Sequence, residues 1–136
     1  MNPLKSILSI AASGMRAQSE RLKVISENVA NANSLGTSPN EDPYRRKTVS
    51  FAEMVDKKTG ASMVEVKEVS HDTTKFKKFY DPSHPAANGE GFVKNTNVNT
   101  LIEMANMREA SRSYEANLNM FEAGRRMRAQ ILDLLK

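Results

Sequence analysis

Two pairs of residues have the types and spacing that acid–base chemistry would need. His71 is followed directly by Asp72, and His84 comes shortly after Asp81. A histidine beside a carboxylate can act as a general base, provided that a nucleophile or a third metal ligand stands nearby. Neither pair has such a companion at a recognisable spacing, so we interpret both as ordinary surface or turn histidines. A small hydrolase that uses His84 and Asp81 is retained only as a third hypothesis.

The residues that other chemistries require are missing or badly spaced. The 136 residues include no Cys, which excludes disulfides, thiolate zinc sites and cysteine nucleophiles. Gly60, Gly89 and Gly91 fit neither the dinucleotide-binding pattern nor the phosphate-binding loop. The sequence therefore predicts a protein that is not an enzyme, with no catalytic, cofactor-binding or metal-binding residues and no cofactor.

The positive charge of the chain raises the question of a nucleic-acid partner. Lys and Arg number 20 against 16 Asp and Glu, which gives a net charge of +4. The tightest basic cluster is Arg125, Arg126 and Arg128, but Glu122 precedes it and Asp133 follows it. Interleaved charges of this kind favour a solvated helix face over a phosphate-binding stripe, so we expect no nucleic-acid partner. A small basic helical nucleic-acid-associated protein remains the alternative function.

No stretch of the sequence is apolar enough for a membrane span. The longest apolar runs are only a few residues long, whereas a transmembrane helix needs about 20. Lys5 followed by residues 7–12 resembles the start of a signal peptide, but serines interrupt this stretch and its helical pattern continues beyond any plausible cleavage point. We therefore expect neither a transmembrane segment nor a cleaved signal peptide.

The N-terminal part of the sequence has the pattern of a coiled-coil helix. Asn2 can cap the free N–H groups of a helix, and Pro3 suits the first helical position. The residues that follow step by alternating fours and threes, a period of 3.5 that is typical of a coiled-coil seam, with Gln18 as the one polar exception. The seam consists of Leu4, Leu8, Ala11, Met15, Gln18, Leu22, Ile25, Val29 and Ala32.

A second long helix is predicted after the Asn-rich stretch at residues 95–99. Its seam slips in phase once, near Gly124, where two steps of three follow each other. Gly124 costs stability inside a helix, so it indicates either close approach of another backbone or a tolerated accident. The seam consists of Met104, Met107, Ser111, Tyr114, Leu118, Phe121, Gly124, Met127, Ile131 and Leu134.

The middle of the chain is predicted to hold three short strands, at residues 48–51, 64–67 and 74–80, between loops rich in Pro, Asn and Gly. These strands carry too few large apolar residues for an independent sandwich. The predicted fold class is mainly α, with the two terminal helices pairing as a coiled coil around a small β-containing or extended middle segment. The corresponding segments are 1–36, 37–97 and 98–136.

Two long helices with narrow apolar seams offer surface for association. Because a lone helical hairpin is marginal, its seams are expected to bind other copies, and a contact that does not close into a ring generates a helical assembly. The residues alone therefore favour a polymerising structural subunit.

Several motifs resemble those of bacterial flagellar axial proteins of the rod and hook. The N-terminal signature consists of SGMRAQ at 13–18, RL at 21–22 and NVANAN at 28–33 with Gly36 after it. Mild departures are Thr37, where the family usually has an aromatic residue, and Phe92, where Tyr is frequent. Further blocks resemble the proximal rod proteins of this family: YRRK at 44–47, DPSHP at 81–85, GFV at 91–93, NVN at 97–99, EM at 103–104 and SRSYEAN at 111–117.

The resemblance implies a function, a location and partners. It implies a non-enzymatic subunit of the periplasmic rod of the flagellar basal body, the drive shaft that transmits motor torque. It also implies export by the flagellar type III apparatus without a cleaved signal peptide. The implied partners are other copies of the chain, the rod proteins FlgB, FlgF and FlgG, the rod adaptor FliE, the inner-membrane ring FliF and the export machinery.

The residues expected to make subunit contacts lie on the two seams. Two amides near the end of the first helix, Asn28 and Asn31, are candidates for bonding neighbouring backbone, although an ordinary helix C-terminus explains them as well. The seam residues expected to interact are Leu8, Met15, Leu22, Ile25 and Val29 on the first helix and Met107, Tyr114, Leu118, Phe121, Met127 and Ile131 on the second.

Overall fold

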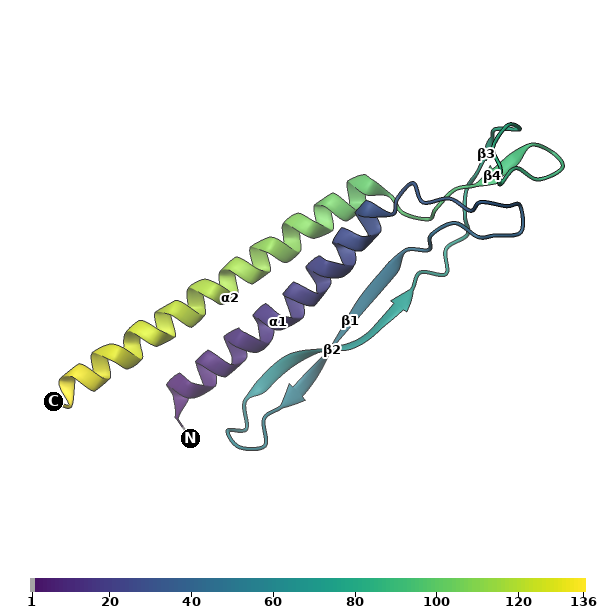
Figure 1. Cartoon of the computed structure of the whole chain (residues 1–136). Helices are drawn as coiled ribbons and strands as arrows, with labels where there is room; N and C mark the ends of the chain where they lie inside the picture. Colours follow the sequence, from purple (N-terminus) through teal and green to yellow (C-terminus); the bar gives the residue numbers. More distant parts are fainter. Residues whose placement is uncertain (1) are drawn as a thin grey trace. The chain divides into compact units, whose positions relative to one another are not determined.

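The computed structural model describes residues 2–136. Two long helices at the ends of the chain flank a small region of strands, which confirms the predicted fold class (Figure 1). In chain order the elements are α1 (Pro3–Ala30), β1 (Lys47–Val55), β2 (Ser62–His71), β3 (Lys78–Tyr80), β4 (Phe92–Lys94) and α2 (Thr100–Leu134).

The chain divides into two compact units, and each takes residues from both helices. The first unit comprises Met1–Lys23, Val49–Glu68 and Arg108–Lys136. The second unit comprises Val24–Thr48 and Val69–Met107.

Both helices begin at an Asn cap, as the N-terminal sequence pattern predicts for α1. The Asn2 Oδ1 atom accepts hydrogen bonds from the backbone N–H groups of Leu4 at 3.1 Å and Lys5 at 3.4 Å. At the start of α2, the Asn99 Oδ1 atom accepts the N–H groups of Leu101 at 3.1 Å and Ile102 at 3.4 Å. Each cap satisfies donors that have no partner within the helix itself.

In the first unit, α1 and α2 form an antiparallel pair. Leu8 of α1 lies against Gly124 of α2, and Gly14 of α1 lies against Asn117 of α2. A surface ion pair joins Arg21 to Glu109 at 3.5 Å. The α2 residue number falls as the α1 number rises, so these contacts define one antiparallel register.

The buried face of α1 in the first unit is wider than the predicted seam. Ala11 is on the seam and buried, but Ser13 and Ala17 are buried as well and lie off it. The reason is that α1 lies between α2 and the β1–β2 hairpin (Figure 1), and Val64 of β2 donates its N–H to the Ser13 Oγ atom at 3.3 Å. A helix covered on two sides buries a broader stripe than a two-helix seam requires.

Strands β1 and β2 form a two-stranded antiparallel hairpin that contains the first two predicted strands. Thr48 bonds Ser70 through their hydroxyl groups at 3.0 Å, and the Ser50 hydroxyl donates to the Glu68 carbonyl at 3.4 Å. In the connecting turn, Gly60 adopts a φ of 70°, a conformation that glycine reaches at little cost.

Strands β3 and β4 form a second two-stranded sheet in the second unit, with Phe79 opposite Val93. The third predicted strand is largely wrong, because only residues 78–80 of 74–80 are strand. The carbonyl of Thr74 instead accepts hydrogen bonds from the Arg45 and Asn97 side chains. The short strand β4 was not predicted, since the glycines just before it read as turn.

Candidate functional site

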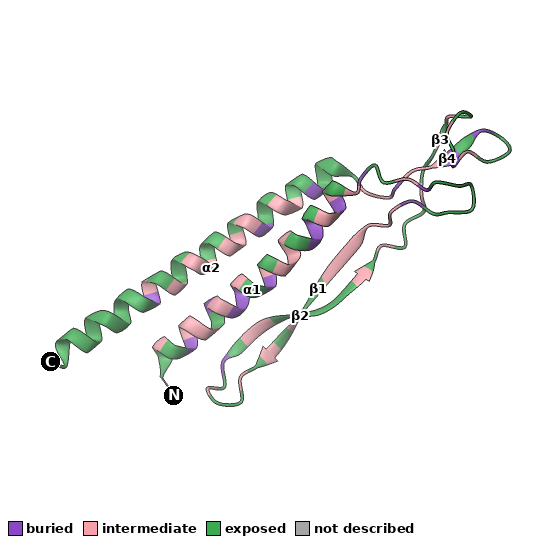
Figure 2. Cartoon of the chain, in the orientation of Figure 1, coloured by how far each residue is buried: buried purple, intermediate pink, exposed green. Residues whose placement is uncertain are grey.

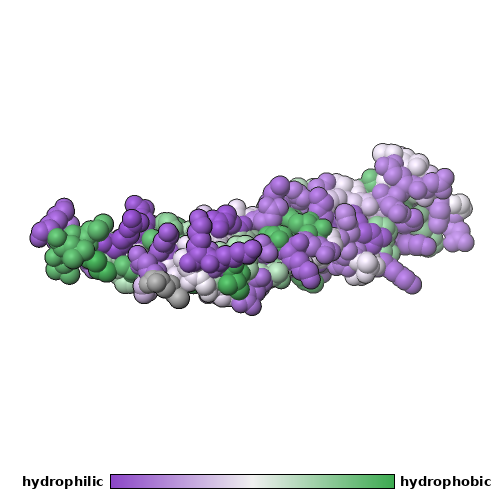
Figure 3. Space-filling view, turned by 90° about the horizontal axis from the view of Figure 1, so that it is seen from below, coloured by the Kyte–Doolittle hydropathy of each residue, from purple (hydrophilic) through white to green (hydrophobic). Residues whose placement is uncertain are grey.

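The last part of α2 is an exposed apolar surface in the first unit. All residues from 125 to 136 are exposed, and the exposed fractions of Met127, Ile131 and Leu134 are 41%, 46% and 84%. These three residues continue the stripe that contacts α1 at Gly124. Figure 3 shows this hydrophobic end in green at the left, and Figure 2 shows the same stretch of α2 as exposed. We call residues 125–136 the α2 end.

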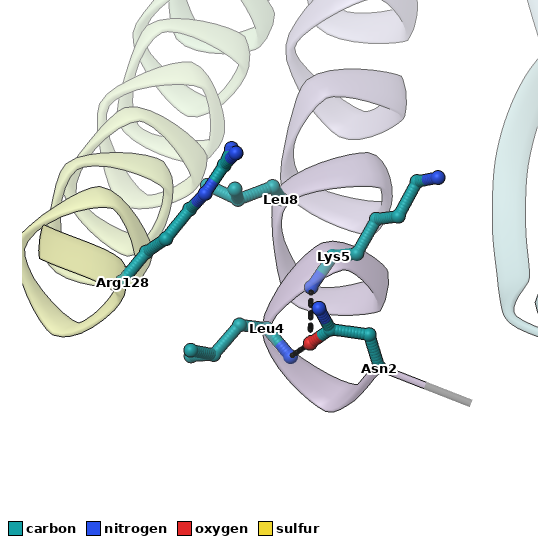
Figure 4. Close-up of a pocket in the computed structure, with 5 residues that line it drawn as sticks. All are labelled: Asn2, Leu4, Lys5, Leu8 and Arg128. Atoms are coloured by element: carbon teal, nitrogen blue, oxygen red, sulfur yellow. Dashed lines mark hydrogen bonds between the residues drawn. The ribbon is translucent and has the colours of Figure 1, made fainter. Parts of the chain in front are cut away.

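A small pocket lies where contact between the two helices stops. It has a volume of about 210 Å³ and is lined by Asn2, Leu4, Lys5, Leu8 and Arg128 (Figure 4). The Leu4 and Leu8 side chains point toward α2, and the Arg128 side chain reaches across to Leu8. In this register Gly124 lies opposite Leu8, so residues 130–134 of α2 lie beyond Pro3, where α1 starts. Ile131 and Leu134 are therefore exposed because α1 starts too late to cover them, whereas Met127 lies near the first turn of α1 and is only partly covered.

A second exposed apolar surface lies in the second unit, on the first turns of α2. Leu101, Ile102 and Met104 are all exposed, while Glu103 between them is fully buried. The usual pattern, in which apolar residues point inward and charged residues outward, is reversed here. Such a reversal indicates both a polar interior partner for Glu103 and an outward apolar face available for association.

The buried Glu103 carboxylate is paired with arginine. The Arg46 Nε atom donates to Glu103 Oε1, and the Arg46 Nη1 atom lies 3.2 Å from Asp72 Oδ2. Hydrogen bonds from Thr74 lower the pKa of Asp72, and the Arg46 guanidinium lowers it further. The pairing with Arg46 offsets the cost of burying the Glu103 side chain.

Asn28 of α1 uses all of its hydrogen-bonding capacity inside the second unit. Its Nδ2 atom donates to the Lys47 carbonyl at 2.9 Å and to Glu103 Oε2 at 3.4 Å. Its Oδ1 atom accepts the Tyr44 hydroxyl at 2.8 Å and the Lys47 N–H at 2.9 Å. Burial raises the pKa of Tyr44, which keeps its hydroxyl protonated as a donor.

Asn97 and Arg45 hold the segment that enters β3. Asn97 Oδ1 accepts the Arg46 N–H at 2.6 Å, and Asn97 Nδ2 donates to the carbonyls of Asp72 and Thr74 at 3.0 and 3.1 Å. The Arg45 guanidinium donates to the same two carbonyls and stacks over the Phe76 ring at 4.2 Å. These side chains tie together the end of α1, the start of α2 and the segments at 44–47 and 72–74. The polar junction, as we call it, consists of Asn28, Tyr44, Arg45, Arg46, Asp72, Asn97 and Glu103.

The residues predicted for subunit contacts fall into three groups by burial. Met127 and Ile131 are exposed, and Ile25 and Asn28 are buried. Asn31 follows the end of α1, where its Nδ2 atom bonds the Glu27 carbonyl at 2.9 Å, as at an ordinary helix C-terminus. Their contacts with other subunits remain a prediction. The half-buried members are Leu8, Met15, Leu22, Val29, Asn31, Met107, Tyr114, Leu118 and Phe121.

Local sequence patterns predict no role for most residues of the polar junction. Tyr44, Arg46, Asn97 and Glu103 belong to the recognised motifs, but their mutual contacts join residues far apart in the chain. The local signal that Glu103 offers is its place in the first turn of α2, where a negative charge suits the helix dipole, and this signal does not predict its burial.

The candidate catalytic residues are engaged in turn structure. His84 accepts the Ala86 N–H at its Nδ1 atom at 3.0 Å, and Asp81 Oδ1 accepts the Ser83 hydroxyl at 2.9 Å. Across residues 2–136, no three His, Asp or Glu side chains gather in a way that could hold a metal ion. In the same residues, neither helix combines the length and apolar character that a membrane crossing requires.

Comparison with protein families identifies the class. Residues 8–36 match the family model "Flagella basal body rod protein", and residues 90–134 match "Flagellar basal body rod FlgEFG protein C-terminal". The matched stretches are those of the two terminal helices and the segment before α2. The fold and the two matches define a flagellar basal-body rod protein.

Full-length relatives give the family within this class. The flagellar basal-body rod protein FlgC of Agrobacterium fabrum is 51% identical over 136 residues, which cover 100% of this chain and 98% of that protein. The FlgC proteins of Escherichia coli O6:H1 and Salmonella typhimurium are each 40% identical over 133 residues, which cover 96% of this chain and 97% of theirs. The chain belongs to the FlgC family.

Family membership decides between the functions that the sequence left open. The chain is a structural subunit of the flagellar basal-body rod and not an enzyme. Membership also implies assembly with other rod components. The nucleic-acid alternative is not supported. Its arginine cluster lies on the α2 end, where Glu122 lines the same shallow surface as Arg125 and Arg126.

Proposed function

We propose that the chain polymerises with other copies and with other rod proteins through its terminal helices, and that the α2 end is a principal contact. The observation that carries this proposal is the exposed stripe of Met127, Ile131 and Leu134, which continues beyond the start of α1. A helix from a neighbouring subunit can cover this stripe by the packing that α1 provides further along α2. Because such a contact is heterologous and need not close into a ring, it generates a helical assembly.

The half-buried seam residues are proposed to contribute at the edges of the same contacts. Leu8, Leu118 and Phe121 each retain some exposed surface within the helix pair, which a neighbouring subunit can bury. Asn28 acts differently in this proposal. Its amide is saturated inside the chain, so it fixes the shape of the subunit rather than touching a partner.

Torque transmission follows from the same contacts. A rod subunit under torque experiences shear, which interdigitated side chains resist better than smooth surfaces do. The polar junction adds directional hydrogen bonds and charge pairs around Arg46 and Glu103. We therefore assign to the α2 end the transfer of load between subunits and to the junction the rigidity of the second unit.

The named partners and the route of export rest on the resemblance to the rod and hook family. The proposed partners are FlgB, FlgF, FlgG, FliE and FliF together with the type III export machinery, and the proposed location is the periplasmic part of the rod. Within the chain we propose that 1–36 and 98–136 serve assembly along the shaft and that 37–97 packs between subunits.

The substitution Ile131→Asp tests the proposed contact. It places a charge on the exposed stripe without touching α1, so the isolated chain should keep the helicity of the wild type. Burying an unpaired carboxylate in a subunit interface costs several kcal/mol, so rods should fail to assemble and swimming should be lost. Swimming in soft agar and the rod content of isolated basal bodies are the measurements.

The matched control is Gln130→Asp, which introduces the same charge at the neighbouring exposed position, off the stripe. It should leave swimming near the wild-type level. Normal swimming in the Ile131→Asp strain, or equal loss in both strains, would contradict the α2 end as a contact.

A further inference from the structure

In the first unit, each helix carries one glycine that receives a side chain of the other helix. Gly14 of α1 faces the amide of Asn117 on α2, and Gly124 of α2 faces Leu8 on α1. A Cβ atom at Gly124 would lie 3.1 Å from Leu8 Cδ2, a tight contact that a flexible side chain can relieve. The two contacts are reciprocal, because each helix supplies one glycine and one side chain that packs against the glycine of the other helix.

The contact at Gly14 is the tighter of the two. A Cβ atom there would lie 2.6 Å from Asn117 Oδ1 and 2.7 Å from both Cγ and Nδ2. The Asn117 amide is also held in place, because its Nδ2 atom donates to the Ser113 carbonyl at 2.8 Å. Any side chain at position 14 must therefore displace the amide and break this bond, or push the helices apart.

The two contacts distinguish the observed register from its competitors. Helices with a 3.5-residue period have alternative alignments one heptad away, in which apolar residues still face each other. If α2 shifts by seven residues in one direction, Asn117 lies opposite Arg21, and Gly14 lies opposite Gly124 with a void between the two glycines. If α2 shifts by seven residues in the other direction, Asn117 lies opposite Ile7. Only the observed register places a glycine opposite both protruding side chains.

We propose that Gly14 and Asn117 are positioning residues that set the register of α1 against α2. This role goes beyond the assembly contact proposed above, because it determines how far α2 extends past the start of α1. A slip of one heptad would change which residues of the α2 end are exposed. The pair therefore controls the length and composition of the surface offered to other subunits.

The absence of Cys from the sequence allows a direct test by cross-linking of the full chain. Replacing Arg21 and Glu109 by Cys reports the observed register with a short thiol cross-linker. Replacing Arg21 and Ala116 by Cys reports the register shifted by one heptad. The original Arg21–Glu109 pair is a surface ion pair, so its loss should have little effect on stability.

Three variants are compared in each cysteine background: Gly14→Ala, Asn117→Ala and the double variant. Overpacking by the added methyl group should lower the cross-link of the observed register by about tenfold in Gly14→Ala and raise that of the shifted register. Asn117→Ala removes the protruding amide without adding a clash, so the observed register should still dominate while the cross-link of the shifted register rises above its wild-type level. The double variant should recover the cross-link to within about twofold of the wild type, because the three atoms nearest to the new methyl group are removed. Swimming, measured without the cysteines, should follow the same order.

Gly89→Ala is the matched control, because a Cβ atom there meets nothing within 4 Å. It should change neither cross-link nor swimming. The proposal is overturned if Gly14→Ala retains the wild-type cross-link. It is equally overturned if the double variant is as impaired as Gly14→Ala, including the case in which both fail to fold.

Discussion

At the scale of single residues, Glu103 shows how a charge can be used inside a small protein. Its side chain is fully buried, yet it receives hydrogen bonds from Arg46 and from Asn28. A buried ion pair contributes little compared with an apolar pair of the same shape, but removing one partner leaves an uncompensated charge. A substitution that removes one charged partner and leaves the other buried therefore destabilises the polar junction. Glu103 is its most sensitive position, because its side chain is fully buried.

The residue-scale prediction concerns Glu103→Ala. This change leaves Arg46 with Asp72 as its remaining charged partner, so the cost should be about 3 kcal/mol, the lower end of the range for breaking a buried pair. Urea unfolding of the full chain, followed by circular dichroism, measures the change. Glu109→Ala is the comparison, because Glu109 forms only the exposed pair with Arg21 and should cost less than about 1 kcal/mol. Equal effects of the two substitutions would refute the assigned role of Glu103.

At the scale of elements, the helices are specified locally and the short strands are not. Asn99 caps α2 and sits directly before it, so the start of this helix can be read from neighbouring residues. Strand β4 forms because Val93 is buried against the rest of the second unit and because β3 pairs with it. Neither condition is visible in the few residues that make up the strand.

The element-scale prediction is that Asn99→Ala weakens the start of α2. The substitution removes the acceptor of the Leu101 and Ile102 N–H groups, which should cost about 1 kcal/mol. Urea unfolding again measures the loss. Asn119→Ala, an exposed change in the interior of the same helix, should be neutral or slightly stabilising because Ala has the higher helix propensity. A loss of stability in both variants would show that the cap has no special role.

At the scale of the whole molecule, the two parts of α2 that lie within the first unit differ in how they are held. Within the first unit, Ala110 is fully buried, whereas every residue from 125 onward is exposed. Most helical stability in proteins comes from the packing of an apolar face, so a helix end without packing frays readily. The α2 end is therefore expected to become ordered on assembly, when a neighbour covers it.

Amide hydrogen exchange of the isolated chain and of assembled rods tests this expectation. In the isolated chain, amides of residues 125–134 should exchange at least about tenfold faster than those of residues 108–121, which pack on α1. In rods the difference should disappear. If residues 125–134 are already as protected in the isolated chain as in rods, the α2 end is complete without a partner and the proposed contact is wrong.

The sequence by itself determined the two long helices, the Asn2 cap of α1 and the flagellar resemblance. These features depend on residues close together in the chain, or on motifs that are recognisable one at a time. The tertiary structure decided the pairing of Glu103 with Arg46, the saturation of Asn28, the strand β4 and the contact between Gly14 and Asn117. Each of these contacts joins residues that are separated in the chain. The strength of such a contact depends on differences of a few tenths of an ångström in the distance between the two groups, which no local sequence pattern encodes.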